Sequence, residues 1–169
     1  MRGGRLLLRP ALHAGGVALV IVAIVGGLGW IFQQPLLFPS LGPTIFIHTV
    51  SPQQEAARPW NTFAGHGIGA IAAFLSLALL GALHAPAAMA AGDIMPARLA
   101  ASALAVGLTI AAQLPLGAVH APAAATTLLI TLGGLKADAA TICLLVCGIG
   151  LASFLCDWGR RFTAPEFRR

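Results

Sequence analysis

The sequence predicts an all-α integral membrane protein with four transmembrane helices and two short, proline-broken helical segments. Charged residues make up only 9% of the 169 residues, and hydrophobic residues make up 58%. A soluble domain carries about 25% charged residues. So few charges cannot coat a water-facing surface, which excludes an ordinary soluble globule, a disordered chain and a disulfide scaffold. We therefore expect one transmembrane domain over residues 1–169, with the lipid bilayer as its main partner.

The basic residues are concentrated at the two ends of the chain. Seven of the ten lie there, namely Arg2, Arg5, Arg9, Arg160, Arg161, Arg168 and Arg169. Basic flanks stay on the cytoplasmic side, so both termini are expected in the cytoplasm and the number of crossings is even. The sequence has no basic stripe with interleaved aromatic residues, so nucleic acid is not an expected partner.

Four stretches are long and apolar enough to cross a bilayer, which takes about 20 residues. They lie at about residues 12–32, 62–83, 96–114 and 138–157. The first ends near Trp30 and is not followed by a signal-peptidase site, so it is a membrane helix. Asn61 before the second is a favoured N-cap residue. The third is interrupted only by Arg98 and Gln113, and Asp157 closes the fourth.

Two further segments, residues 35–50 and 118–134, are apolar but too short or too broken for ordinary spans. Each contains a proline, Pro43 or Pro122, that should begin a short helix after an extended stretch. Proline suits the first helical position because its missing N–H would be unpaired there. Half-helical or re-entrant segments of this kind are tolerated at membrane depth only where protein or a water-filled cavity covers them.

The order span, broken segment, span occurs twice, which favours two internal repeats. Pro43 precedes Gly67 by 24 residues, and Pro122 precedes Gly148 by 26. Four spans with re-entrant segments would make the repeats parallel, whereas six crossings would make them inverted. Both arrangements place eight basic residues inside and two outside. We favour four spans, because the helix after Pro43 would be only about eight residues, or ~12 Å, long.

The acidic residues avoid the predicted bilayer centre. All five lie in loops or at span ends: Glu55, Asp93, Asp138, Asp157 and Glu166. This argues against a cation channel with an acidic ring and against a carboxylate proton relay. No catalytic triad, metal-ligand pattern or phosphate-binding loop is present, so we expect no enzyme activity, no cofactor and no metal site.

Hydrogen-bond donors are what the broken segments carry instead. Two half-helices would also point free N–H groups and positive dipole ends into the membrane interior. Donors without carboxylates suit a small inorganic anion, and suit a neutral polar solute less specifically. The candidate substrate-binding residues are His120, Pro122, Thr126, Thr127, His66, Asn61, Pro43 and Thr44. The competing interpretation is that His66 is a packed histidine and that the threonines bond to their own helix carbonyls.

Several motifs together carry a family resemblance. They are Leu41-Gly42-Pro43-Thr44, Ser51-Pro52, Arg58-Pro59-Trp60-Asn61, Gly65-His66 and the stretch from Val119 to Leu129. In this order they resemble the HPP family of integral membrane proteins, over roughly residues 14–157. The resemblance implies four membrane spans and, from some members, similarity to nitrite transporters. Ala121 stands where the family's His-Pro-Pro motif has its first proline, while His120 and Pro122 are kept.

These observations lead to three functional hypotheses. The first is a small-anion transporter of the plasma (inner) membrane, with nitrite as the candidate substrate. The second is a non-transporting membrane scaffold or partner subunit, and the third is a pore for water or neutral solutes. In each case we expect a homo-oligomer, because six short elements make a thin bundle.

Overall fold

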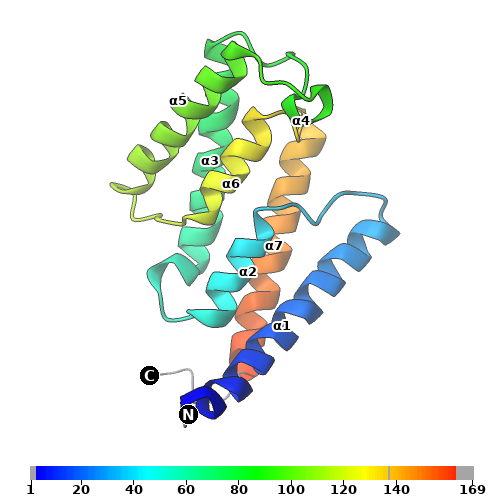
Figure 1. Ribbon diagram of the computed structural model, residues 1–169, viewed down its shortest axis with the longest axis vertical. Coiled ribbons are helices and arrows are strands. Elements are labelled where there is room, and N and C mark those ends of the chain that lie inside the picture. Colours follow the sequence, from blue (N-terminus) through cyan, green and yellow to red (C-terminus); the bar gives the residue numbers. More distant parts are fainter. Residues whose placement is uncertain (1–2, 137, 163–169) are drawn as a thin grey trace.

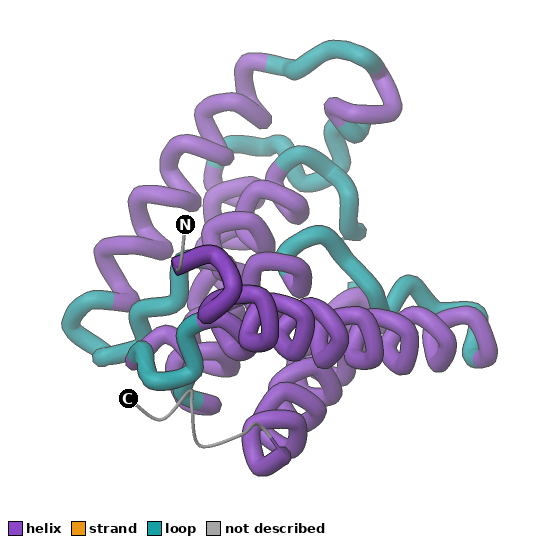
Figure 2. Tube along the Cα trace, turned by 60° about the horizontal axis from the view of Figure 1, so that its bottom comes forward, coloured by secondary structure: helices purple, strands orange, loops and turns teal. Residues whose placement is uncertain are grey.

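The computed structural model describes residues 3–136 and 138–162, and this part of the chain contains helices and loops but no strand (Figures 1 and 2). The elements are α1 (Gly3–Ile31), α2 (Leu41–Val50), the short 3-10 helix η1 (Glu55–Ala57), α3 (Pro59–Leu79), α4 (Ala88–Ala91), α5 (Pro96–Gln113), α6 (Pro122–Thr131) and α7 (Ala139–Phe162). The all-α fold class is confirmed. Arg2, Arg168, Arg169 and Glu166 lie outside the described residues.

Three helices, not four, are long and apolar enough to count as candidate membrane spans among the described residues. They cover Leu8–Ile31, Pro59–Leu79 and Ala139–Gly159. The remaining predicted span corresponds to α5, which has 18 residues and carries Arg98 and Gln113, both buried. The prediction of four spans is therefore not confirmed.

The directions of the helices differ from the arrangement that we favoured. Figure 1 shows α1 and α3 running the same way and α7 running opposite to both. The contacts agree: Val17 lies beside Gly159, whereas Leu36, further along the chain, lies beside Gly148. A re-entrant segment between the first two spans would require α1 and α3 to be antiparallel. The parallel-repeat arrangement is therefore not confirmed, because the chain between α1 and α3 returns toward the end where it started.

The two short helices lie at the centre of the molecule, where α2 packs against α1 and α7, and α6 packs against α3 and α5 (Figure 1). Each short helix thus contacts a long helix from the other half of the chain. They also contact each other, and α3 contacts α7. This arrangement surrounds the broken backbone with protein, as a membrane interior requires.

Two glycines allow the extended stretches to cross the long helices. A Cβ atom at Gly65 of α3 would lie 2.7 Å from the Cβ of His120 and 3.1 Å from the carbonyl oxygen of Ala118. A Cβ at Gly148 of α7 would lie 2.9 Å from the carbonyl oxygen of Leu36. In each half, the loop before the short helix therefore runs directly over a glycine of the other half.

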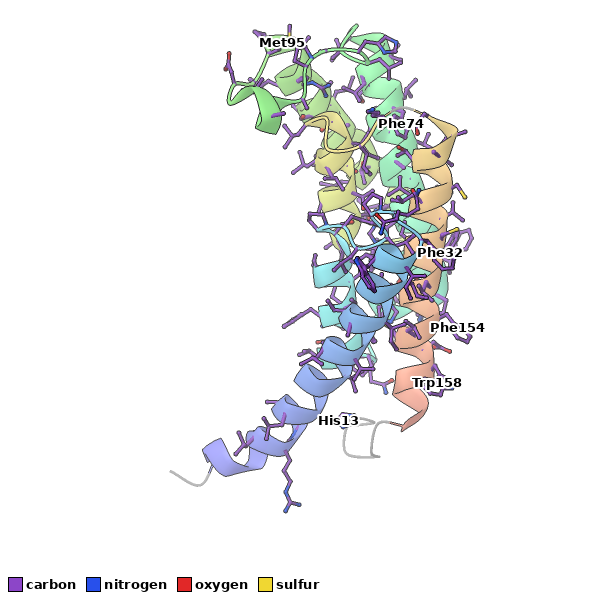
Figure 3. All side chains as sticks on the ribbon, turned by 90° about the vertical axis from the view of Figure 1, so that its right-hand side faces the viewer. His13, Phe32, Phe74, Met95, Phe154 and Trp158 are labelled. Carbon is purple, nitrogen blue, oxygen red and sulfur yellow. The ribbon has the colours of Figure 1, made fainter. Side chains whose placement is uncertain are left out.

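Large apolar side chains cover the outside of the bundle. Trp30, Leu19 and Phe154 are 77%, 68% and 67% exposed. Phe154 and Trp158 project from α7 in Figure 3. Such a surface is stable against lipid and not against water, so the chain is an integral membrane protein.

Candidate functional site

The candidate site lies where the first turns of α2 and α6 cross. The hydroxyl oxygens of Ser40 and Thr126 are 2.6 Å apart. The hydroxyl of Thr44, one turn along α2, lies 3.2 Å from Nε2 of His120, just before α6. Moving forward along the chain from Ser40 to Thr44 corresponds to moving backward from Thr126 to His120. The two short helices are therefore antiparallel.

His66 of α3 joins the two sides of this crossing. Its Nε2 lies 3.0 Å from the Thr44 hydroxyl, and its Nδ1 lies 2.7 Å from the Thr126 hydroxyl. The rings of His66 and His120 meet edge to face, with centroids 4.9 Å apart. All five side chains, Ser40, Thr44, His66, His120 and Thr126, are 0% exposed. We call these five residues the histidine–hydroxyl cluster.

His120 is held by elements beyond the cluster. Its Nδ1 lies 2.7 Å from the carbonyl oxygen of Ala56 in η1. Its backbone N–H donates to Oε1 of Gln113 at the end of α5, at 3.1 Å. The Gln113 side chain in turn donates to the carbonyl oxygen of Gly65, at 3.3 Å. Ala56 of η1 therefore orients the imidazole of His120, while Gln113 of α5 holds its backbone.

Four of the eight predicted site residues meet in the cluster: His120, His66, Thr44 and Thr126. Pro122 is the first residue of α6 and is buried, as predicted. Pro43 is exposed and does not begin α2, which starts two residues earlier at Leu41. The expected start at Pro43 is therefore wrong. Proline is tolerated anywhere in a first turn, because the N–H groups there lack helical partners.

The other two predicted residues serve packing around the cluster. Asn61 donates to the carbonyl oxygen of Val119 at 3.1 Å and so ties α3 to the loop before His120. Thr127 lies beside Thr109 of α5, with hydroxyl oxygens 3.0 Å apart, and also bonds to the carbonyl of Ala123. Neither has a hydrogen bond to a member of the cluster in the part of the chain that the structure describes.

His48 and Thr49, also donors of the first broken segment, lie elsewhere. Nε2 of His48 is 2.9 Å from the hydroxyl of Thr62, which pins the end of α2 to the start of α3. The Thr49 hydroxyl donates to the carbonyl of Ile45 in its own helix, at 2.8 Å. The helix-bonding interpretation of the threonines is thus correct for Thr49.

The sequence indicated Ser40 as a donor of the first broken segment but not as a candidate site residue, and it placed neither Gln113 nor Arg98 among the functional candidates. Arg98 is buried, and its guanidinium donates to the carbonyl oxygens of Pro86 at 2.7 Å and Thr131 at 2.6 Å, and to that of Ala85. It therefore satisfies the C-terminal end of α6, where helix carbonyls lack partners. The sequence could have indicated this role. Arg98 and Gln113 are the polar interruptions of one apolar stretch, and such residues usually face the protein interior.

Two small cavities flank the cluster. One, of about 230 Å³, lies between α5 and α6 and is lined by His120, Gln113 and Thr109 among others. The other, of about 250 Å³, lies between α3 and α7 and is lined by His66 and apolar residues. The two contacting histidines therefore separate two cavities.

Larger hollows lie elsewhere and have a different character. Two grooves of about 640 and 540 Å³ run along α1, and their lining is almost entirely apolar. These suit lipid chains or another apolar helix, and not an ion. Among the described residues, no group of three or more histidine, cysteine or acidic side chains is placed to hold a metal ion.

The fold and site define a helical membrane protein in which two antiparallel short helices cross at a buried cluster of histidines and hydroxyls. A family model described as the HPP transmembrane region matches residues 4–157, so the chain belongs to the HPP family. No curated protein and no solved structure matches the chain.

Proposed function

We propose that this protein transports a small inorganic anion, with nitrite as the first substrate to test. The observation that carries the proposal is the position of the two histidines. His66 and His120 touch each other inside the protein, and each lines a different cavity. An anion moving from one cavity to the other would pass between these two imidazoles.

The electrostatics of the crossing favour an anion over a cation. The N-terminal ends of α2 and α6, each ten residues long, overlap there, and helix N-termini attract negative charge. The surrounding side chains are hydroxyls and imidazoles, which can donate hydrogen bonds. None of the acidic side chains in the described residues belongs to the cluster. Glu55, Asp93 and Asp138 are exposed, and Asp157 lies near the end of α7.

A proposed topology accompanies this function. The first half, α1 to α3, and the second half, α5 to α7, would be inverted repeats that cross the membrane six times, with α2 and α6 as half-helices in broken crossings. The opposite directions of α2 and α6, and their packing against helices of the other half, support this assignment. The start of α1 and the end of α7 lie at the same end of the molecule (Figure 1), and their basic residues favour the cytoplasmic side.

Labelling of single cysteines tests this topology. Six crossings place position 58 on the cytoplasmic side and position 98 near the outer side, whereas four spans reverse both. Arg58 is 64% exposed and can be replaced without disturbing packing. Labelling of Arg58→Cys from outside intact cells would contradict the six-crossing topology.

Flux measurements on purified protein in liposomes test the transport itself. We expect saturable nitrite uptake that His120→Ala abolishes. His84→Ala is a matched control, because His84 has the same His-Ala-Pro-Ala-Ala sequence but is exposed in a loop. Undiminished uptake by His120→Ala would remove His120 from the mechanism. No uptake of any anion by the wild-type protein would refute transport and favour a scaffold or partner subunit, and osmotic swelling without anion uptake would favour a neutral-solute pore.

The protein is further proposed to form homo-oligomers in the plasma (inner) membrane. The apolar groove between α1 and α2, of about 640 Å³, offers a surface on which a second copy can pack. The mass of the protein in a mild detergent checks this, and a strictly monomeric species would contradict it.

A further inference from the structure

The hydrogen-bond directions in the histidine–hydroxyl cluster determine where protons lie. The carbonyl oxygen of Ala56 can only accept, and it is 2.7 Å from Nδ1 of His120. Nδ1 of His120 must therefore carry a hydrogen. In a neutral imidazole the other nitrogen is then a bare acceptor. Neutral His120 thus presents an unprotonated Nε2 to the hydroxyl of Thr44.

Thr44 has one hydroxyl hydrogen and three polar neighbours. Its oxygen lies 2.9 Å from the carbonyl of Ser40, 3.0 Å from Nε2 of His66 and 3.2 Å from Nε2 of His120. While His120 is neutral, the single hydrogen can satisfy either the Ser40 carbonyl or His120, but not both. With the hydrogen of neutral His66 on Nε2, a second proton on Nε2 of His120 lets both imidazoles donate to Thr44, and the Thr44 hydrogen then points to the Ser40 carbonyl. All three contacts are satisfied together only in this protonated state.

The rest of the cluster is consistent with this assignment. If Nε2 of His66 donates to Thr44, its Nδ1 accepts from the hydroxyl of Thr126, at 2.7 Å. The Thr126 oxygen then accepts from the hydroxyl of Ser40, at 2.6 Å. The five side chains therefore form one continuous hydrogen-bonded network from Ser40 to His120.

Among the residues that the structure describes, no charged group contacts His120 in a way that would neutralise an imidazolium. The titratable groups on the packed elements are His66, in ring contact, and His48, one turn beyond Thr44 on α2. Next to Ala56, Glu55 and Arg58 pair with each other at 3.1 Å and are 76% and 64% exposed. On α5 the nearer polar residue is the uncharged Gln113, and Arg98 lies at the opposite end of the helix. A buried charge without a partner is costly, so a proton on His120 needs a counter-ion.

We infer that His120 takes up a proton together with the transported anion, which makes the protein a proton–anion symporter. This rests on the proposed anion transport and names its coupling ion. The proton binds Nε2 of His120, the anion binds in the cavity of about 230 Å³ beside it, and the pair carries no net charge. Both leave on the other side, and His120 returns to its neutral form. Thr44 is the positioning residue, since its hydroxyl reorients when His120 changes charge.

Nitrite uptake into liposomes containing an internal pH dye tests the coupling. Protein-free liposomes provide the background leak of nitrous acid. We expect proton uptake that accompanies nitrite one to one, and a steady nitrite accumulation of about tenfold per unit of pH gradient. An imposed membrane potential should leave the initial rate unchanged. Nitrite uptake that follows the potential and moves no protons would overturn the coupling while leaving anion transport intact, and the absence of any anion uptake would instead refute the proposed function.

Two variants and a spectroscopic measurement complete the test. Thr44→Val keeps the side-chain shape but removes the hydroxyl, so stimulation by the pH gradient should be lost, whereas Thr44→Ser should retain it. Nitrogen NMR of labelled histidine in the wild-type protein gives an answer that does not depend on flux. We expect neutral His120 to carry its hydrogen on Nδ1 and to become doubly protonated when nitrite is added at mildly acidic pH. A neutral His120 with its hydrogen on Nε2, or one that stays neutral with nitrite bound, would contradict the inference.

Discussion

Replacing Gly65 by alanine tests whether the loop that carries His120 really runs against α3. The new Cβ would lie 2.7 Å from the Cβ of His120 and 3.1 Å from the carbonyl oxygen of Ala118. Neither atom is the flexible end of a side chain, so the loop itself must shift. Two residues away, a Cβ at Gly67 has no atom within 4 Å. Gly67→Ala is therefore a matched control on the same helix.

The comparison isolates the steric cost. Both variants gain the same roughly 0.5–1 kcal/mol from replacing a helical glycine with alanine. Overpacking costs about 1–3 kcal/mol, and we expect a value near the upper end because backbone must move. Gly65→Ala should therefore be about 2–3 kcal/mol less stable than Gly67→Ala, measured as the free energy of unfolding in a detergent titration. Nitrite uptake should also fall in Gly65→Ala. Equal stability of the two variants would refute this placement of the loop.

Three further predictions follow from other contacts. Gly148→Ala should destabilise the protein by about 1–3 kcal/mol, because its Cβ would lie 2.9 Å from the Leu36 carbonyl oxygen. Gly150→Ala is the control, because the atom nearest to its new Cβ would be 3.5 Å away. Equal unfolding free energies of the two variants would contradict the crossing of the Leu36 loop over α7. Arg98→Met should lower the free energy of unfolding by roughly 2–4 kcal/mol, because three buried carbonyls lose their donor. Arg58→Met removes only an exposed ion pair and should cost at most about 1 kcal/mol. Similar losses of stability in a detergent titration would argue against a structural role for Arg98. The hydrogen bond from the backbone N–H of Thr141 lowers the pKa of the Asp138 carboxyl. The stabilising effect of this hydrogen bond is therefore present at neutral pH and is lost as the pH falls through the folded-state pKa. Asp138→Ala should be less stable than wild type at pH 7 and equally stable in acid. A difference in stability that persists in acid would exclude the ionised Asp138 carboxyl as its cause.

The apolar character of the chain and its proline punctuation made much of the fold predictable. Long uncharged stretches identify α1, α3 and α7, because a bilayer sets their length and composition. Pro122 correctly marks the start of α6. The directions of the helices were not predictable in this way. Basic residues count equally for four and six crossings, so the choice depended on the length of one short helix. In the structure α1 and α3 run the same way (Figure 1), and this follows from how the helices pack and not from their local sequence.

The site was predictable in its residue types and not in its partners. His66, His120, Thr44 and Thr126 stood out because polar side chains inside apolar segments must be satisfied. Their meeting depends on the crossing of α2 and α6, which joins residues 86 positions apart, as in Ser40 and Thr126. The residues around Ser40 and around Thr126 do not indicate that these two side chains pair. For the same reason Thr127, the neighbour of Thr126, seemed equally suitable, although it faces α5.

The most direct test of the central claim is a nitrite titration of the protein in lipid, followed by the nitrogen NMR signals of its five histidines. Histidine-to-asparagine variants assign the signals. We expect the signals of His120 and His66 to shift together and saturably, and those of His13 and His84 to stay where they are. Unchanged His120 and His66 signals at nitrite concentrations that saturate uptake would show that the anion does not pass the histidine–hydroxyl cluster.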